Sequence, residues 1–458
     1  MTAFPSIGKE TRAILRIAMP LTAAYVAEMG MVITDMVMVG RIGSNELAAV
    51  GLAGDLFWML LLIGMGVIAM VGVIAAQNLG ANNTRGVISA CEQGMIVATV
   101  TSLPIMLCVW LLGPLLALAQ QDPLVVDLAS SYARALTLAV LPALWFVVLR
   151  NYITALAHSA AVGWIMFAAL ALNPLINYVL IFGKLGMPAL GVVGAGIGTT
   201  VVNYLMFAAL AAHVLDAPQY ARFRPRLLPR RADRALLREI FRLGIPNAAT
   251  QILNGAMFSA AALIVGAISA AALAAQQIMY TALYIALSAA AALADAVRVR
   301  VAFGIGRGNA HAANQSAHIS LALGFFATLV AALPLWLFPD LLIGLFLDAR
   351  DAANSEVVAV ALSLSAVTGV FLLLDGTQMV TASAIKGLRD TRSPLLICIV
   401  GYWLVGLGAG MWLCFPGAQG VRGLWFGLTL GVLVSNLLMY LRFRQRISAA
   451  TLALRGDG

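Results

Sequence analysis

Long apolar stretches separated by short polar segments dominate this chain. Twelve of them are long enough to cross ~30 Å of hydrocarbon as helices, which takes ~20 residues each. The regular alternation of apolar and polar residues that marks membrane strands is absent, so the spans are predicted to be helical. We place them at residues 13–39, 46–78, 86–119, 123–157, 161–182, 189–215, 235–267, 270–302, 312–347, 353–386, 393–416 and 421–446.

The pattern of the first half repeats in the second half. Residues 16–49 align with residues 242–275 at a constant offset of 226, so that Pro20 matches Pro246 and Gly40 matches Gly266. Two similar halves in a membrane protein indicate two bundles that move around a site between them. An all-α integral membrane protein with two pseudo-symmetric six-helix bundles is therefore predicted.

The polar segment 216–234 lies between the sixth and seventh spans. It contains Pro218, Pro225 and Pro229, which suit an extended linker. We therefore predict an N-terminal lobe at 1–226 and a C-terminal lobe at 227–458. Six spans in each half give the two lobes the same orientation across the membrane.

Composition and charge support a membrane location. The chain is 62% hydrophobic and 10% charged, with a mean hydropathy of +0.96. Most of its basic residues fall at the two termini and in the loops on their side, which predicts that both termini are cytoplasmic. Anionic lipid headgroups account for the net charge of +9, so no nucleic acid partner is expected.

The sequence contains no pattern typical of an enzyme or of a cofactor-binding protein. The four cysteines have apolar neighbours and lack metal-ligand spacing, and no nucleotide-binding loop or catalytic triad spacing is present. We expect no cofactor and no ATP-driven pumping. Energy then comes from an ion gradient, from the substrate's own gradient or from a partner.

Charged residues inside spans cost a few kcal/mol each and call for an explanation. The deep ones are Glu28, Asp35, Arg150 and Asp375. Glu28 and Asp35 are seven residues apart and share a helix face. A carboxylate among methionine side chains is poorly solvated as an anion, which suits a proton carrier. The alternative is an acid that pins two helices together.

Asp375 lies one helical turn from Phe371, Gln378 and Met379. An acid with such neighbours can attract a lipophilic cation. The alternative is an acid satisfied by a Gln or Thr of a neighbouring helix. Arg150 either pairs with one of the acids or extends to the membrane interface.

The segment Asn173-Pro174-Leu175-Ile176-Asn177 is predicted to break the fifth helix. Asn177 and Thr199 would then supply oxygens beside a carboxylate. Hard oxygen ligands of this kind suit Na⁺ or a protonatable network.

Several sequence blocks together carry a family resemblance. The chain resembles the multidrug and toxic compound extrusion (MATE) family, close to its bacterial NorM-like branch. The blocks are Thr34-Asp35-Met36-Val37-Met38-Val39-Gly40-Arg41-Ile42-Gly43, Leu243-Gly244-Ile245-Pro246, Ala274-Ala275-Gln276-Gln277, Gly304-Ile305-Gly306-Arg307-Gly308-Asn309, Asp375-Gly376-Thr377-Gln378 and Lys386-Gly387-Leu388-Arg389-Asp390-Thr391.

The resemblance implies a transporter of the bacterial cytoplasmic membrane with a V-shaped cavity between two lobes. It implies export of organic cations in exchange for Na⁺ or H⁺. The family's first-helix acid corresponds to Asp35, and its helix-five Asn and helix-six Thr correspond to Asn177 and Thr199. A second acid found in some members falls on Ile181 and is missing.

The C-terminal half departs from the family pattern. The NorM-like helix-seven Glu is Asn254 here, and the Tyr four residues before Asp375 is Phe371. Because Asn can neither neutralise a cation nor carry a proton, Na⁺ coupling through that site is in doubt. Glu28 occupies the repeat-equivalent position of Asn254, 226 residues earlier.

We therefore predict a cation-coupled multidrug antiporter that exports amphiphilic organic cations by alternating access. The ion-coupling residues are Asp35, Asn177, Thr199 and Glu28, with H⁺ favoured and Na⁺ at Asp35 and Asn177 as the alternative. The substrate path is predicted to include Asp375, Gln251, Asn254, Tyr280 and Met379. We expect a monomer whose partners are small organic cations and membrane lipids.

Two other functions compete with this prediction. A flippase for lipid-linked intermediates would need several cationic residues in its cavity to hold a pyrophosphate, but the deep charges are three acids and Arg150. A membrane receptor or scaffold would need an interaction domain or a long tail, which the sequence does not contain.

Overall fold

The computed structural model describes residues 7–118, 120, 122–227, 231–348 and 351–456. Every regular element within these ranges is helical, and twelve helices there are long and apolar enough to cross a membrane. The predicted fold class and the twelve spans are confirmed. The spans are α1 (Ile7–Gly40), α2 (Ser44–Gly80), α3 (Thr84–Trp110), α5 to α6 (Pro123–Ala155), α7 (Ala160–Phe182), α8 (Gly191–Asp216), α9 (Arg234–Gly266), α10 (Ala270–Gly306), α11 (Ala310–Leu337), α13 (Ser355–Gly387), α14 to α15 (Arg392–Cys414) and α16 (Gly420–Ala453, within a helix that continues to Gly456).

Two spans end earlier than predicted. The third ends at Trp110 and the ninth at Leu337, and each is followed by a separate short helix, α4 (Leu112–Leu118) or α12 (Pro339–Gly344). Pro339 is the first residue of α12, where its missing N–H costs no helical bond. The hydropathy pattern does not reveal these breaks, because the short helices are as apolar as the spans before them.

The break predicted at Pro174 is wrong. Helix α7 runs without interruption from Ala160 to Phe182, with Pro174 inside it. A proline removes one backbone hydrogen bond from a helix, and membrane helices tolerate this loss when neighbouring groups satisfy the freed carbonyl.

The segment between the two halves is held against the first half rather than extended freely. It contains the 3₁₀ helix η2 (Pro218–Phe223). The hydroxyl of Tyr152 donates to the Phe223 carbonyl at 2.6 Å, and the Arg226 amide donates to Glu92 Oε1 at 3.0 Å. Gln93 donates to the Arg231 carbonyl at 3.1 Å. Through these bonds, polar side chains of α3 and α6 hold the segment that follows α8.

The chain divides into two compact units whose boundaries lie inside helices. The N-terminal unit is Pro20–Ala248, and the C-terminal unit combines Met1–Met19 with Ala249–Gly458. The boundaries at 19/20 and 248/249 lie beside Pro20 and Pro246, the matched prolines of the repeat. Each unit therefore includes the first part of a long helix whose remainder belongs to the other unit.

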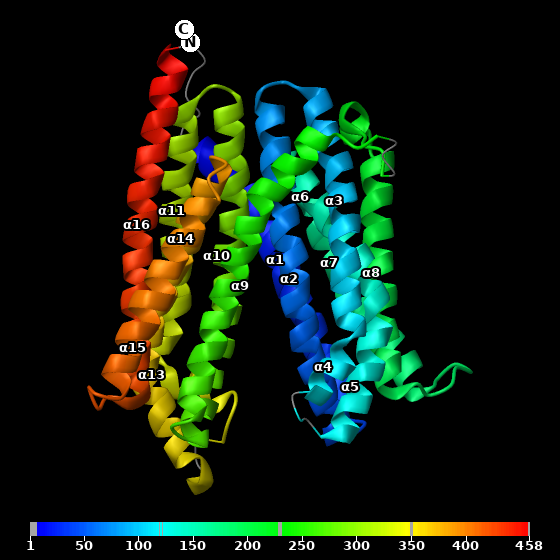
Figure 1. Cartoon of the computed structure of the whole chain (residues 1–458), viewed down its shortest axis with the longest axis vertical. Coiled ribbons are helices and arrows are strands. Elements are labelled where there is room, and N and C mark those ends of the chain that lie inside the picture. The colour runs from blue at the N-terminus through cyan, green and yellow to red at the C-terminus, as the bar shows by residue number, and fades with distance from the viewer. Residues whose placement is uncertain (1–6, 119, 121, 228–230, 349–350, 457–458) are drawn as a thin grey trace. The chain divides into compact units, whose positions relative to one another are not determined.

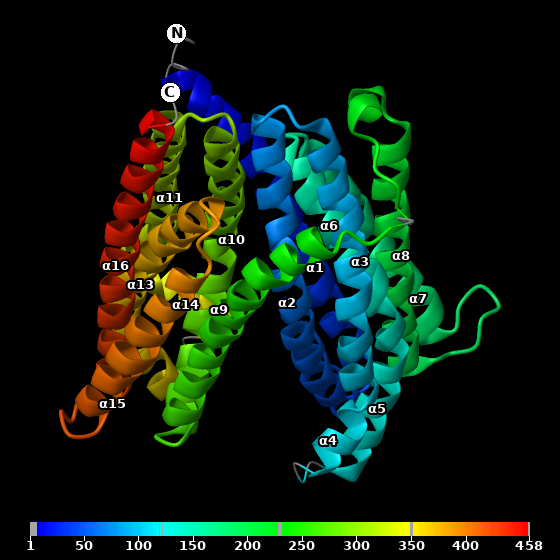
Figure 2. The ribbon, with the colours of Figure 1, turned by 45° about the horizontal axis from the view of Figure 1, so that its top comes forward.

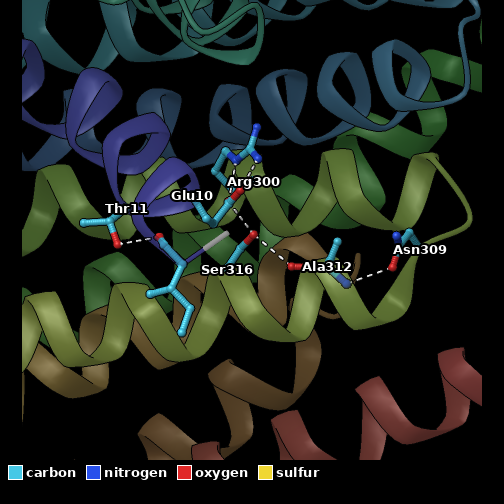
Figure 3. Close-up of polar contacts among 7 residues, drawn as sticks. Glu10, Thr11, Arg300, Asn309, Ala312 and Ser316 are labelled. Carbon is cyan, nitrogen blue, oxygen red and sulfur yellow. Dashed lines mark hydrogen bonds and ion pairs between the residues drawn. The ribbon is translucent and has the colours of Figure 1, made fainter. Parts of the chain in front are cut away.

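In the C-terminal unit, the start of α1 is fixed by Glu10, whose side chain is buried (Figure 3). Both of its carboxylate oxygens accept from Arg300 of α10, at 2.8 and 2.6 Å, and Oε1 also accepts from Ser316 of α11 at 2.6 Å. A carboxylate held by a two-pronged guanidinium and a hydroxyl is a strong, directional anchor.

In the N-terminal unit, the start of α9 packs closely on α2. Asn247 donates to the Gly66 carbonyl at 2.7 Å. A side chain at Gly244 would meet the backbone of Val67, and one at Gly66 would meet the backbone of Ala248. Small residues allow helix backbones in membranes to approach closely, which explains their use here.

Within each unit the long helices pack side by side. In the C-terminal unit α13 packs on α10, α11 and α16, and α11 also packs on α10; in the N-terminal unit α2 packs on α3 and α6, and α7 on α8 (Figures 1 and 2). The buried core of the C-terminal unit is aliphatic and aromatic, and it includes Phe371, Tyr402 and Trp425. The polar groups described next interrupt these apolar surroundings.

Candidate functional site

Asp35 is the centre of a polar cluster in the N-terminal unit. Asn177 of α7 donates its Nδ2 to Asp35 Oδ1 at 2.5 Å, and the Thr199 hydroxyl of α8 lies 3.3 Å from Oδ2. The side chain of Asn173, one turn before Asn177, also hydrogen-bonds to this carboxylate. The three predicted residues Asp35, Asn177 and Thr199 thus lie together, and we call them with Asn173 the Asp35 cluster.

Close packing of α7 on α8 holds this cluster in place. A side chain at Gly194 would meet the backbone of Leu180, and one at Gly198 would collide with Asn177 Oδ1. Asn203 donates to the Thr199 carbonyl at 2.8 Å, one turn along α8. The two glycines therefore let α7 bring its amide to the acid of α1.

Glu28 lies on the same helix as Asp35 but has a different partner. Its Oε2 is 4.0 Å from Nη1 of Arg150 in α6, and both side chains are largely buried. The guanidinium also lies 5.4 Å from the centre of the Tyr25 ring, within range of a cation–π contact. Of the two alternatives for Arg150, pairing with an acid is the one observed.

Asp375 is the centre of a second cluster, in the C-terminal unit. The hydroxyl of Tyr402 lies 2.5 Å from Asp375 Oδ1 and 2.7 Å from Gln378 Oε1. Asn436 of α16 donates to Thr377 Oγ1 at 2.7 Å and to the Leu374 carbonyl at 3.1 Å. These bonds tie α13 to its neighbours on both sides of the acid. We call Asp375, Gln378 and Tyr402 the Asp375 cluster.

Asn254 of α9, a predicted substrate-path residue, accepts a hydrogen bond from Cys398 at 2.9 Å between Sγ and Oδ1. Cys398 precedes Tyr402 by four residues, so Asn254 lies near the Asp375 cluster. Next to it, the Trp403 indole donates to the Leu253 carbonyl at 3.2 Å. Helix α9 is thus held against the segment that carries Tyr402.

The other predicted substrate-path residues lie in varied surroundings. Tyr280 belongs to an aromatic cluster, 5.1 Å from Phe258 and 5.6 Å from Trp425 between ring centroids. Phe371 contacts the same two rings. Gln251 is exposed on α9 and Met379 is half-buried on α13. Tyr280 therefore shares its aromatic partners with Phe371, which lies one helical turn before Asp375.

The sequence reading missed Tyr402, Cys398 and the contact of Asn173. Tyr402 lies in an apolar stretch and carries a hydroxyl that needs a partner when buried. That need was the available signal, but it does not say which acid the hydroxyl reaches. Among the residues that the structure describes, no group of three or more His, Cys, Asp and Glu side chains could hold a metal ion.

Comparison with known proteins gives a consistent result over almost the whole chain. The MatE family model matches residues 20–179 and 246–412. The two matched segments start 226 residues apart, which is the offset of the internal repeat. The chain is 36% identical over 434 residues to a probable multidrug resistance protein NorM of Pseudomonas aeruginosa, covering 95% of this chain and 89% of that one. It is 33% identical over 452 residues to multidrug resistance protein NorM of Burkholderia vietnamiensis, covering 98% and 97%.

Solved structures show the same fold. A eukaryotic MATE transporter, AtDTX14, superposes with a TM-score of 0.84 at 19% identity, over 98% of this chain and 100% of that chain. A MOP superfamily transporter from Pyrococcus furiosus superposes with a TM-score of 0.87 at 20% identity, over 96% of each chain. At this level of identity the likeness supports the fold alone.

Proposed function

The chain belongs to the MatE family, and we propose that it exports amphiphilic organic cations from a bacterial cell in exchange for H⁺. Members of the family are transporters and not enzymes, and the twelve spans make this chain a multi-pass membrane protein. Its NorM relatives are named for multidrug resistance. We propose that both termini face the cytoplasm, where the basic loops favour them.

The observation that carries the choice of H⁺ is the direction of the hydrogen bonds at Asp35. Asn177 presents its amide N–H to the carboxylate, while its Oδ1 points toward Gly198. Sodium is bound by oxygen ligands, and in the Asp35 cluster Asn177 turns its N–H₂ rather than its Oδ1 toward the carboxylate. Donors of this kind hold a carboxylate that alternately binds and releases a proton.

In the proposed mechanism, proton binding at Asp35 favours one arrangement of the transporter, and substrate binding favours the other. Asn177 and Thr199 position the carboxylate of Asp35. Asp375, with Asn254, Tyr280, Gln251 and Met379 around the path, attracts the cationic group of the substrate. Glu28 contributes a second acid whose charge is balanced by Arg150.

The test is ethidium efflux from proteoliposomes that contain the full-length protein. We expect an imposed pH gradient to drive efflux and an imposed Na⁺ gradient to have no effect. Asp35→Asn should abolish efflux, whereas Asp55→Asn, at an exposed acid of α2, should leave it unchanged. Efflux driven by Na⁺ alone would overturn the choice of ion, and full activity of Asp35→Asn would overturn the coupling role.

A further inference from the structure

The hydroxyl of Tyr402 lies between two oxygen acceptors and has a single proton to donate. Its hydroxyl oxygen lies 2.5 Å from Asp375 Oδ1 and 2.7 Å from Gln378 Oε1, and all three residues are buried. A phenol has one O–H donor, so it can donate to one of these oxygens at a time. The second oxygen then needs a different proton in the contact, because two facing lone pairs repel each other.

Two arrangements satisfy every group of the Asp375 cluster. In the first, Asp375 is protonated and donates to Tyr402, whose hydroxyl donates to Gln378 Oε1. In the second, Asp375 is ionised and accepts from Tyr402, while the Gln378 amide is turned by half a rotation so that its N–H₂ donates to the phenol oxygen. The placement of Gln378 Oε1 toward Tyr402 matches the first arrangement.

The position of the Tyr402 hydroxyl is fixed by the helix that carries it. Tyr402 lies in a π-helix, η4 (Ile399–Leu407), between α14 (Arg392–Cys398) and α15 (Gly408–Cys414). A side chain at Gly431 of α16 would meet the backbone of Gly401 and Gly406, so this wide helix lies directly against α16. π-Helical turns are rare and occur often at functional sites. Because the phenol is held, the Gln378 amide is the group that can turn.

The groups around Asp375 other than Tyr402 and Gln378 have little influence on the charge of its carboxyl group. Cys398 is a titratable group near Asp375 on the packed segments. Tyr280 of α10 packs on Phe258, which in turn packs on Phe371. Lys386 lies three turns further along α13. The neighbouring helices α11 and α16 contribute Thr328, next to Gly376, and Asn436, neither of which titrates.

We propose that Tyr402 and Gln378 are positioning residues that decide when Asp375 can accept a cationic substrate. When Gln378 presents its carbonyl, the cluster holds a neutral acid; when the amide turns, Tyr402 stabilises the carboxylate and an organic cation can bind. The inference rests on the proposed role of Asp375 in the substrate path and adds the two residues that control it.

The two residues have opposite effects, which makes the proposal testable. Replacing Tyr402 by Phe removes the donor to the ionised acid. Replacing Gln378 by Met removes a bond from both arrangements: the acceptor of the Tyr402 proton when Asp375 is protonated, and a donor to the phenol oxygen when Asp375 is ionised. An unpaired buried O–H donor costs more than an oxygen that still donates its own proton, so this change disfavours the neutral acid. One substitution should therefore weaken cation binding at low pH, and the other should strengthen it.

The experiment is ethidium binding to the purified full-length protein, followed by fluorescence polarisation across pH 5 to 9. A hydrogen bond to a charged group contributes ~1.5 kcal/mol or more, so Tyr402→Phe should move the pH of half-maximal binding up by about one unit. Gln378→Met should move this midpoint down. Tyr440→Phe, at a tyrosine of α16 beside His318, should leave it in place.

The outcomes separate this proposal from the proposed function. If Asp375→Asn binds ethidium with the parent's affinity and pH profile, the substrate role of Asp375 fails. If Asp375→Asn loses binding, but Tyr402→Phe and Gln378→Met leave the midpoint unchanged or move it in the same direction, the control by these two residues is overturned. If either Tyr402→Phe or Gln378→Met does not fold, the pH midpoint of the other variant tests the proposal by itself.

Discussion

Gly198 makes room for the amide of Asn177, because any side chain at Gly198 would collide with Asn177 Oδ1. The amide placed in this way donates to Asp35, the acid that we propose as the coupling residue. A glycine with no chemistry of its own therefore controls the geometry of the Asp35 cluster.

We predict that Gly198→Ala impairs transport through this contact. The added methyl group would push Asn177 away from Asp35 and remove a hydrogen bond to a charged group, which contributes about 1.5 kcal/mol or about tenfold. Proton-driven ethidium efflux should fall by roughly that factor, as it should for Asn177→Ala. Gly54→Ala is the matched control, because a methyl group there meets nothing within 4 Å. Equal activity of Gly198→Ala and Gly54→Ala would contradict the prediction.

We predict that Glu10→Ala lowers the stability of the protein. Removing the carboxylate leaves Arg300, whose side chain is 22% exposed, without its bidentate partner. Breaking a buried ion pair from one side costs about 3 kcal/mol or more. The melting temperature of the detergent-solubilised protein should fall clearly for Glu10→Ala. It should fall less for Ser316→Ala, which removes one hydrogen bond. Lys9→Ala, at the exposed neighbouring position, should have no effect.

We predict that Asp390 makes stability depend on pH in the acid range. Burial raises the pKa of this carboxyl, but hydrogen bonds from the Ser393 amide and hydroxyl and the charges of Arg446 and Arg442 outweigh it and lower the pKa. A lowered pKa in the folded state means that the contribution is fully present above the unfolded value of about 3.9 and is lost as the pH falls through the folded value.

Thermal melts of the parent and of Asp390→Asn at several pH values test this. The difference in melting temperature should be constant above about pH 5 and should shrink as the pH falls below about 4. A difference that stays the same down to pH 3 would show that the ionisation of Asp390 is not linked to folding.

We predict that Glu28 and Arg150 are energetically coupled. Arg150→Gln leaves the buried acid without its nearest described cation, and Glu28→Gln leaves the guanidinium with Tyr25. A double-mutant cycle of unfolding free energies should give a coupling of about 1 kcal/mol. As a control, Glu28→Gln combined with Arg134→Gln should be additive, since Arg134 lies against Trp110. Additivity of both cycles would exclude the pair.

The acids of the two units are held by corresponding spans. Asp35 accepts from Asn177 of the fifth span, and Asp375 contacts Tyr402 of the eleventh, which is the fifth of its half. The acids themselves come from the first and tenth spans, which do not correspond. In each half, the residue that contacts the acid therefore comes from the fifth span. The acid itself comes from spans that do not correspond between the halves.

The sequence by itself determined the twelve spans, the repeat at an offset of 226, the family, and the meeting of Asp35 with Asn177 and Thr199. The spans can be predicted because the membrane requires each of them to be apolar along its own length. The Asp35 cluster can be predicted because the family resemblance identifies its residues one by one. The tertiary structure decided the remaining features: the unbroken α7, the anchor of Glu10 on Arg300, and the contact of Tyr402 with Asp375. These join residues as far apart as Glu10 and Ser316, 306 positions along the chain. Such contacts depend on how each helix is rotated and how closely small residues let it approach its neighbour, and hydropathy does not encode either.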